Sequence, residues 1–256
     1  MDGPTVLLHR EGRLATVTLN RPPLNILDIP TIDRLGEVAA ELAADPDLTV
    51  VILRGAGDRA FSAGVALQDH TPDRVGPMLD SLHGMIRRLR DLDAITIAAV
   101  QGHCLGGGME VATCCDLLIA TEDARFGQPE IEVGCYPPVA AALFPSRIGF
   151  GKTLDLILTG RTLSCDEAER LGLVTRRVPP GGLDAAVQEI TEAILAKSAP
   201  VVRLAKKAVR AGRDLPFSEA LSETERIYKA ELLPLEDLAE GAAAFLEKRR
   251  PVWRNR

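Results

Sequence analysis

Two glutamates are the clearest candidates for acid–base chemistry in this sequence. Glu110 follows three successive glycines, Gly106 to Gly108, and is surrounded by residues that are nearly all apolar or small. Such a run is typical of a buried helix, where a carboxylate is costly unless it is paired or used. Read alone, Glu110 is equally well explained as an acid that complements the positive N-terminal end of its own helix.

Glu130 is the second candidate, and it follows a loop at residues 124–129. Gly127 and Pro129 in this loop restrict the backbone and thereby aim the side chain. The plainer alternative is a solvated loop acid, as expected for the neighbouring Glu132. A second carboxylate adds weight to general acid–base catalysis, although a solvated loop acid remains the simpler interpretation of Glu130 taken alone.

The glycines before Glu110 suggest a place for a ligand oxygen. Without a Cβ atom, the backbone of Gly106 to Gly108 can approach a ligand closely. Amide N–H groups at a helix start lack backbone partners and lie at the positive end of the helix dipole, which suits a developing oxyanion. Glycine-rich loops alone are common, so the buried acid beside them is the specific feature.

Other catalytic motifs find no support. Residues 148–153 resemble the end of a phosphate-binding loop, but Ser146 occupies the position of its first glycine. No G-x-S-x-G segment is present, and the four histidines lack the spacing of a zinc site. The five cysteines are odd in number and mostly have apolar neighbours, so we expect reduced, buried thiols and no metal.

The elements that must position these residues alternate between strands and helices. Apolar patterns predict strands at residues 14–19, 49–53, 95–100 and 116–120. A helix opens at Pro30 and Thr31, and Ser164 with Glu167 forms a capping box for another that stops near Gly172. From Leu183 onward the pattern is almost wholly helical, with segments at residues 183–198, 200–212, 216–233 and 235–249.

The composition bounds the class of protein. The 256 residues carry 30 Lys and Arg against 36 Asp and Glu, a formal net charge of −6, and 46% are hydrophobic. This describes an ordinary globular protein and argues against intrinsic disorder and against binding to a nucleic-acid backbone. Charges interrupt every apolar stretch before it could cross a membrane, and no targeting segment is recognisable, so we expect a cytoplasmic protein.

Several segments resemble the signatures of the crotonase family, the enoyl-CoA hydratase/isomerase superfamily. The strongest are GHCLGGGME at residues 102–110, FGQPE at 126–130 and AFSAG at 60–64, with weaker matches at 20–22, 158–160 and 245–249. The resemblance covers nearly the whole chain. It implies an α/β fold, the Clp protease-like spiral of ββα units, with a crotonase core at residues 1–197 and a C-terminal helical trimerisation region at 198–256.

The resemblance also assigns roles in the site. The backbone N–H groups of Val65 and Gly107 would stabilise the enolate at a thioester carbonyl. Glu110 and Glu130 would hold a water between them, with Glu110 as the main base and Glu130 as the protonated acid. A coupled pair of carboxylates suits this work because one of them can hold a proton near neutral pH.

By the same resemblance, the substrate is an acyl-CoA thioester, and CoA enters with it, so no separate cofactor is expected. CoA would lie along Ala63, Ala66, Leu67 and Gln68, with Lys248 of the C-terminal tail near its phosphates. Family members assemble through their C-terminal helices, which implies a homo-oligomer, a trimer or a dimer of trimers.

Three departures from the family pattern bear on the substrate. Ala66 replaces a frequent Asp, and residues 20–25 lack a common lysine. Pro138 stands where a glycine N–H usually helps to hold the water, and proline has no N–H. With Tyr136 beside it, this segment shapes the acyl pocket differently and resembles the cyclohexa-1,5-diene-1-carbonyl-CoA hydratase branch.

The sequence therefore predicts a hydro-lyase that adds water to an α,β-unsaturated acyl-CoA, either linear or cyclic. Two alternatives stay open within the family: double-bond isomerisation, and hydrolytic ring opening of a cyclic acyl-CoA. A member that binds CoA without turnover is a third, since Pro138 removes a donor for the water.

Overall fold

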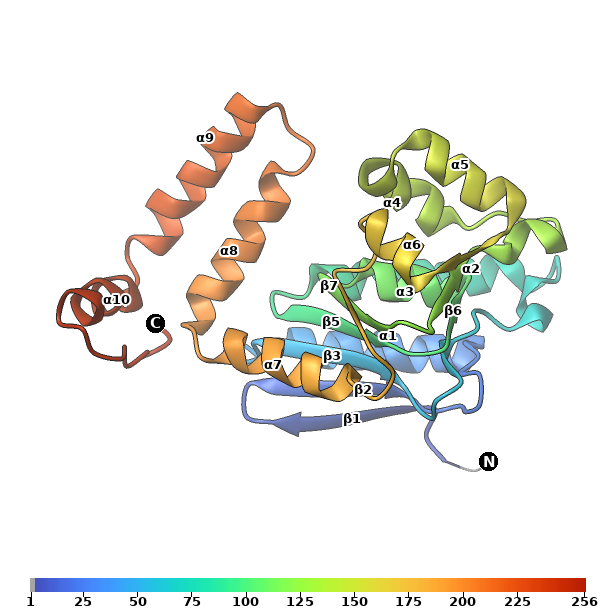
Figure 1. Ribbon diagram of the computed structural model, residues 1–256, viewed down its shortest axis with the longest axis horizontal. Coiled ribbons are helices and arrows are strands. Elements are labelled where there is room, and N and C mark those ends of the chain that lie inside the picture. Colours follow the sequence, from blue (N-terminus) through green and yellow to red (C-terminus); the bar gives the residue numbers. More distant parts are fainter. Residues whose placement is uncertain (1–2) are drawn as a thin grey trace.

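The computed structural model describes residues 3–256 and centres on a six-stranded sheet (Figure 1). The strand order is β1-β2-β3-β5-β7-β10. Only the β1–β2 pair is antiparallel within this sheet. The strands are β1 (Val6–Glu11), β2 (Leu14–Leu19), β3 (Val50–Gly55), β5 (Ile95–Val100), β7 (Leu117–Thr121) and β10 (Arg176–Val178).

A second sheet of four short strands carries the loops of the site. Its order is β4-β6-β8-β9, made of β4 (Ala60–Ser62), β6 (His103–Leu105), β8 (Arg125–Gly127) and β9 (Thr162–Ser164). Three times along the chain, a strand of the large sheet is followed by a strand of the small one: β3 by β4, β5 by β6, and β7 by β8. This repeat is the predicted α/β spiral.

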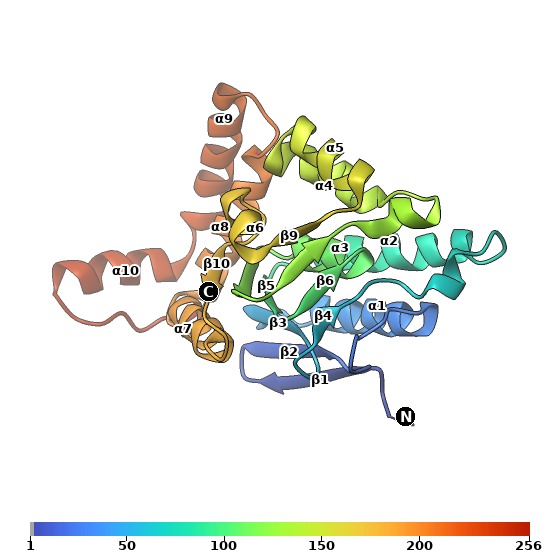
Figure 2. The ribbon, with the colours of Figure 1, turned by 45° about the vertical axis from the view of Figure 1, so that its right-hand side comes forward.

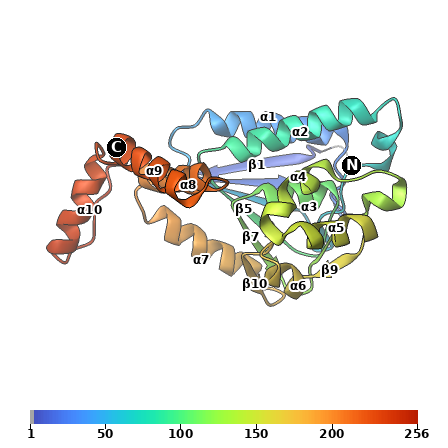
Figure 3. The same cartoon turned by 90° about the horizontal axis from the view of Figure 1, so that it is seen from above.

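Helices cover both faces of the large sheet (Figure 3). On one side lie α1 (Ile29–Ala43) and α2 (Val75–Asp91), which pack against each other. The side chain of Asp28 caps α1 by accepting from the Thr31 N–H at 3.0 Å. On the other side, α7 (Leu183–Leu195) buries its apolar positions against β3, β5 and β7.

A fully buried helix runs through the core. Every residue of α3 (Gly107–Cys114) is buried, including Glu110. Around it lie two short 3₁₀ helices, η1 and η2, and three further helices, α4, α5 and α6. Their bounds are η1 (Leu67–His70), η2 (Pro129–Val133), α4 (Pro138–Ile148), α5 (Phe150–Thr159) and α6 (Cys165–Arg170).

The last helices form an arm that stands away from the core (Figures 1 and 2). It consists of α8 (Ala199–Gly212), α9 (Phe217–Ile227), the π-helical turn η3 (Tyr228–Leu232) and α10 (Glu236–Leu246). The Lys206 ammonium fastens α8 to the core, because it contacts Asp116 and the Ala94 carbonyl at 2.6 Å each. The predicted division at residues 197 and 198 falls between α7 and α8.

Most predicted elements are confirmed within a few residues. Residues 14–19 and 95–100 form strands as expected, and the Ser164 hydroxyl accepts from the Glu167 N–H at 3.1 Å, as in the expected capping. The predicted helix at 216–233 is divided into α9 and η3. The sequence patterns missed β1, α2, α4, α5 and the short strands. No helix among residues 3–256 is both long and apolar enough to span a membrane.

Candidate active site

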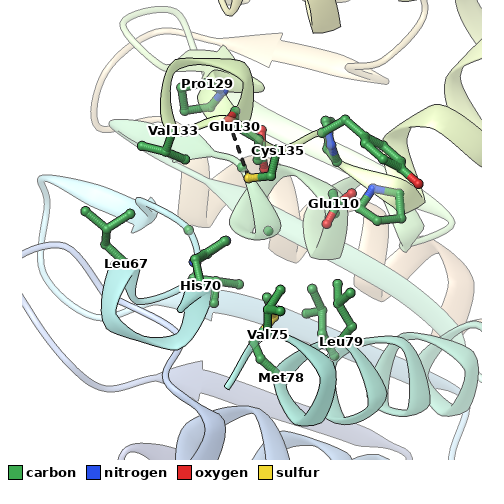
Figure 4. A pocket seen from close by; sticks show the side chains of 18 of the residues that line it. Leu67, His70, Val75, Met78, Leu79, Glu110, Pro129, Glu130, Val133 and Cys135 are labelled. Atoms are coloured by element: carbon green, nitrogen blue, oxygen red, sulfur yellow. Dashed lines mark hydrogen bonds between the residues drawn. The ribbon is translucent and has the colours of Figure 1, made fainter. Parts of the chain in front are cut away.

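A cavity of about 490 Å³ lies between two walls of the core (Figure 4). One wall comes from η1 and α2, and the other from η2 and the start of α4. The glycine loop before α3 closes the inner end with Gly106 and Gly107. Both predicted catalytic acids, Glu110 and Glu130, line this cavity.

Glu110 is held at the inner end of the cavity by the backbone of α4. Its side chain is 2% exposed. The carboxylate Oε1 accepts from the Val139 N–H at 2.9 Å and from the Ala140 N–H at 3.0 Å. Burial raises the pKa of Glu110, and these two amide bonds oppose the rise because they favour the charged form.

Glu130 lies in a more open place, in the first turn of η2. Burial, opposed by a backbone hydrogen bond and supported by the charge of Glu110, raises the pKa of Glu130 to about 7. Gln128, which is fully buried, can offer its amide nitrogen to both Glu130 carboxylate oxygens at 3.1 Å. Glu130 is therefore poised to exchange a proton near neutral pH.

Two backbone amides meet at the inner end of the cavity without backbone partners among residues 3–256. The Leu27 N–H donates to the Gly64 carbonyl and the Ala66 N–H donates to the Leu27 carbonyl, so the Val65 N–H between them points the other way. The Gly107 N–H belongs to the first turn of α3, where no intrahelical acceptor exists. This pair can stabilise a developing oxyanion.

Two glycines are required for this approach. Gly106 has φ +52°, and a Cβ there would lie 2.8 Å from Glu130 Oε1, so the carboxylate rests against the glycine loop. A Cβ on Gly107 would lie 2.7 Å from Val65 Cγ2 and 3.6 Å from the Val65 nitrogen. The two amides and Glu130 thus lie so close together that a Cβ at either glycine would collide with Glu130 or Val65.

The wall opposite Glu130 is apolar. Val75, Met78, Leu79 and Leu82 of α2 line it, and Figure 4 shows the first three below the two acids. Helix α2 was not predicted from the sequence, although most of its buried residues are three or four positions apart. This spacing was the signal that could have found the wall.

The structure brings some of the predicted binding residues to the cavity and not others. Ala63, Leu67, Tyr136 and Pro138 line it, together with the oxyanion candidate Val65.

Three predicted CoA contacts do not line this cavity. Ala66 is buried beneath η1, where its N–H is used by Leu27, and Gln68 is exposed on the outside of η1. Lys248 follows α10 on the arm, which stands away from the core in Figure 1. The expected contact between Lys248 and the CoA phosphates stays a prediction.

Other residues at the site had not been singled out. Gln128 supports Glu130, and His70 lines the cavity with its Nδ1 3.1 Å from the Ala66 carbonyl oxygen. Cys135 also lines the cavity, and its thiol donates to the Glu130 carbonyl at 3.4 Å. The expectation of buried thiols therefore holds for four cysteines and is wrong for Cys135, which is half-buried because it lies in the cavity wall.

Comparison with known proteins gives this site a family. The family model for enoyl-CoA hydratase/isomerase matches residues 9–256. Cyclohexa-1,5-dienecarbonyl-CoA hydratase of Thauera aromatica is 38% identical over 98% of this chain and 96% of its own length. Short-chain-enoyl-CoA hydratase of Clostridium acetobutylicum is 36% identical over 98% of this chain and 97% of its own.

Solved structures agree with this relationship. The crystal structure of enoyl-CoA hydratase from Bacillus anthracis superposes with a TM-score of 0.92 at 30% identity, covering 98% of this chain and all of that one. The chain belongs to the enoyl-CoA hydratase/isomerase family, the crotonase superfamily. Its full-length relatives support an enoyl-CoA hydratase-type function, which is that of a hydro-lyase.

Proposed function

We propose that this protein adds water across the α,β-double bond of an acyl-CoA thioester at the cavity between η2 and α2. The observation that carries the proposal is that Glu110 and Glu130 line the same cavity as the partner-free amides of Val65 and Gly107. A hydration needs both parts: a pair of acid–base groups for the water and donors for the charge on the thioester oxygen.

The reaction divides into proton transfers that the two acids can share. Glu110 takes a proton from the water while the water oxygen bonds to the β-carbon of the substrate. The electrons of the double bond move to the thioester oxygen. The Val65 and Gly107 N–H groups stabilise this enolate. Glu130, which stays protonated up to about pH 7, then gives its proton to the α-carbon of the enolate. Glu110 gains one proton and Glu130 loses one, so the total charge of the pair is unchanged.

The surroundings of each acid support this assignment. Two amide donors favour the charged form of Glu110, which a base requires. Glu130 has the raised pKa expected of an acid that works near neutral pH.

We propose a cyclic dienoyl-CoA as the substrate, in keeping with the Thauera aromatica relative. The wall beside Glu110 is formed by Tyr136, Pro137 and Pro138. Proline fixes the backbone φ angle, so this wall is stiffer than a glycine-rich one and suits a ring better than a flexible chain. In a cyclic diene, the enolate extends over more carbons, and the same amides would stabilise it.

The arm exposes apolar side chains that favour assembly of several copies of this chain. Phe245 and Leu246 on α10 are 84% and 81% exposed, which is costly for a surface that meets only water. We propose that the arms pack between copies in a homo-oligomer, a trimer or a dimer of trimers. In such an assembly, Lys248 would reach the CoA phosphates of another copy. The cytoplasmic location, the degradative role and the absence of a separate cofactor stay predictions.

Product analysis in ¹⁸O-labelled water tests this function. Cyclohexa-1,5-diene-1-carbonyl-CoA and crotonyl-CoA are offered separately, and the thioester products are examined by mass spectrometry. We expect one ¹⁸O atom in the carbon skeleton of the cyclic product. Incorporation of label only with crotonyl-CoA would contradict the cyclic substrate but would support hydratase activity on a linear enoyl-CoA. Label gained from neither would contradict hydration of these substrates and favour isomerisation, hydrolysis or binding without turnover.

A further inference from the structure

A second cavity of about 380 Å³ lies at the far ends of the helices that build the active site. It is bordered by the last residues of α3, at Cys114, and by Arg147 in the last turn of α4. The opposite ends of the same helices carry Gly107 and the amides that bind Glu110. The cavity shares no lining residue with the acyl-CoA cavity, and its volume is within the range of small-molecule sites.

Arginines dominate the lining of this cavity. Five guanidinium groups border it, against three carboxylates: Arg87, Arg90, Arg147, Arg210 and Arg213 against Asp91, Asp116 and Asp214. Two of the carboxylates already have cationic partners. Asp116 contacts the Lys206 ammonium at 2.6 Å and the Arg210 guanidinium at 2.8 Å, and Asp214 lies 3.9 Å from the Arg213 guanidinium. The remaining charge is positive.

Arg147 is the least compensated of these arginines. Arg147 is half-buried, and its guanidinium makes no ion pair or hydrogen bond with any residue from 3 to 256. Burial and the neighbouring charges of Arg213 and Arg90 lower its pKa. Burying an unpaired charge costs free energy, and an anion beside Arg147 would lower that cost.

Helix ends explain some of these arginines but not Arg147. Cations are commonly found where helices end because the last carbonyls carry partial negative charge. Arg210 follows this rule, since it donates to the Arg90 carbonyl at the end of α2. Within residues 3–256, Arg147 donates to no such carbonyl, and neither do Arg87 and Arg90.

We propose that this arginine-lined cavity is a binding site for a phosphate-bearing anion, separate from the acyl-CoA site. Guanidinium groups present planar pairs of donors that match phosphate oxygens, and several of them around one cavity suit an anion with more than one charge. Arg147 supplies the main contact because it has no ion-pair or hydrogen-bond partner among residues 3–256, while Arg90 and Arg213 complete the site from α2 and the end of α8.

The test uses inorganic pyrophosphate and inorganic phosphate as probes on the full chain. Binding is measured by calorimetry, and thermal unfolding is followed against sodium chloride of equal ionic strength. Wild type is expected to bind pyrophosphate more tightly than phosphate and to unfold at a higher temperature with it. Arg147→Met should weaken this binding at least tenfold. The matched control is Arg170→Met, which removes a guanidinium whose side chain is 77% exposed, and it should change nothing.

Unfolding without added anion provides a second readout. If Arg147 is an uncompensated charge, Arg147→Met should unfold at a higher temperature than wild type in anion-free buffer. Equal pyrophosphate binding by wild type and Arg147→Met would overturn the proposal, and so would absence of binding by wild type. A lower unfolding temperature together with a changed oligomeric mass for Arg147→Met would show instead that a carboxylate of a second copy pairs with Arg147. That outcome would also overturn it.

Discussion

The surroundings of Glu110 and Glu130 differ although the two acids line one cavity. Glu110 is held in the interior, on a helix whose residues are all buried, and α4 gives it two amide donors. Glu130 lies on a single turn nearer to solvent, against the glycine loop and beside the amide of Gln128. One region gives its carboxylate two amide donors that favour the charged form, and the other leaves a carboxylate with a pKa of about 7.

This difference shows how one residue type serves two purposes. Desolvation raises the pKa of both acids, but only Glu110 receives two main-chain hydrogen bonds from another element that oppose the rise. Two carboxylates whose environments separate their titrations are a usual arrangement for an acid and a base. The two acids do not differ in this way if the variants described below shift the titration of both acids alike.

The largest effect is expected from neutralising either acid. Glu110→Gln and Glu130→Gln should each lower kcat/KM for hydration by roughly 10²–10⁴-fold, because each removes a proton-transfer group. The rates are followed by loss of the enoyl thioester absorbance.

The double variant tests whether the two acids work as a unit. It should be only slightly slower than the slower single variant, since groups that act together are not additive. If Glu110→Gln retains most of the wild-type rate while Glu130→Gln does not, the enzyme needs one acid only, as an isomerase would.

The next effect concerns the amides that hold Glu110. Val139→Pro removes one N–H donor, so the charged form of Glu110 loses a hydrogen bond worth roughly 1.5–3 kcal/mol. Its pKa should rise, and the acid limb of the kcat/KM profile should move up by about one to two pH units. The matched control is Val139→Ala, which keeps the N–H. Identical acid limbs in both variants would show that the Val139 N–H does not favour the charged form of Glu110.

A third effect is on stability. The folded-state pKa of Glu130 is raised from 4.5 to about 7, so folding is favoured by its neutral form. The stability it contributes is fully present below pH 4.5 and is lost as the pH rises through 7. Glu130→Gln should therefore increase the free energy of unfolding by about 1–3 kcal/mol at pH 8 and leave it nearly unchanged at pH 4. Denaturant unfolding at the two pH values measures this, and equal differences at both would contradict the raised pKa.

The smallest effect is expected at Gln128. Gln128→Met fills the same buried space without a donor, so the charged form of Glu130 loses a partner. The alkaline limb of the kcat/KM profile, where Glu130 deprotonates, should move to higher pH by about one unit or less. The shift is small because the wild-type amide can also turn its oxygen toward the neutral acid. A shift to lower pH would show that Gln128 favours the neutral form.

Local motifs explain what could be predicted from the sequence. Glu110 and Gly107 lie four residues or fewer from the glycines that define their loop, and Val65 directly follows Gly64. Four strands of the large sheet, β2, β3, β5 and β7, were also predictable from their apolar patterns, whereas β1 and the short β10 were not. The partners of Glu110 were not, because Val139 and Ala140 are 29 and 30 residues away and depend on how η2 leads into α4.

The positions that could not be predicted have the same origin. Lys248 follows α10 on the arm, and where the arm lies depends on the packing of α8 against the core through Lys206 and Asp116, which no local pattern reveals. Cys135 reads as a small apolar residue in the sequence, and only the fold of the cavity wall exposes it. Long-range packing decides both positions.

An infrared titration of the carboxyl groups tests the central claim most directly. The band of protonated carboxylic acids is followed from pH 4 to pH 9 in wild type, Glu110→Gln and Glu130→Gln. The account predicts that wild type contains a carboxyl group that titrates near pH 7, and that this titration is absent from Glu130→Gln and present in Glu110→Gln. A titration near pH 7 that disappears with Glu110 instead, or no titration in that range, would contradict it.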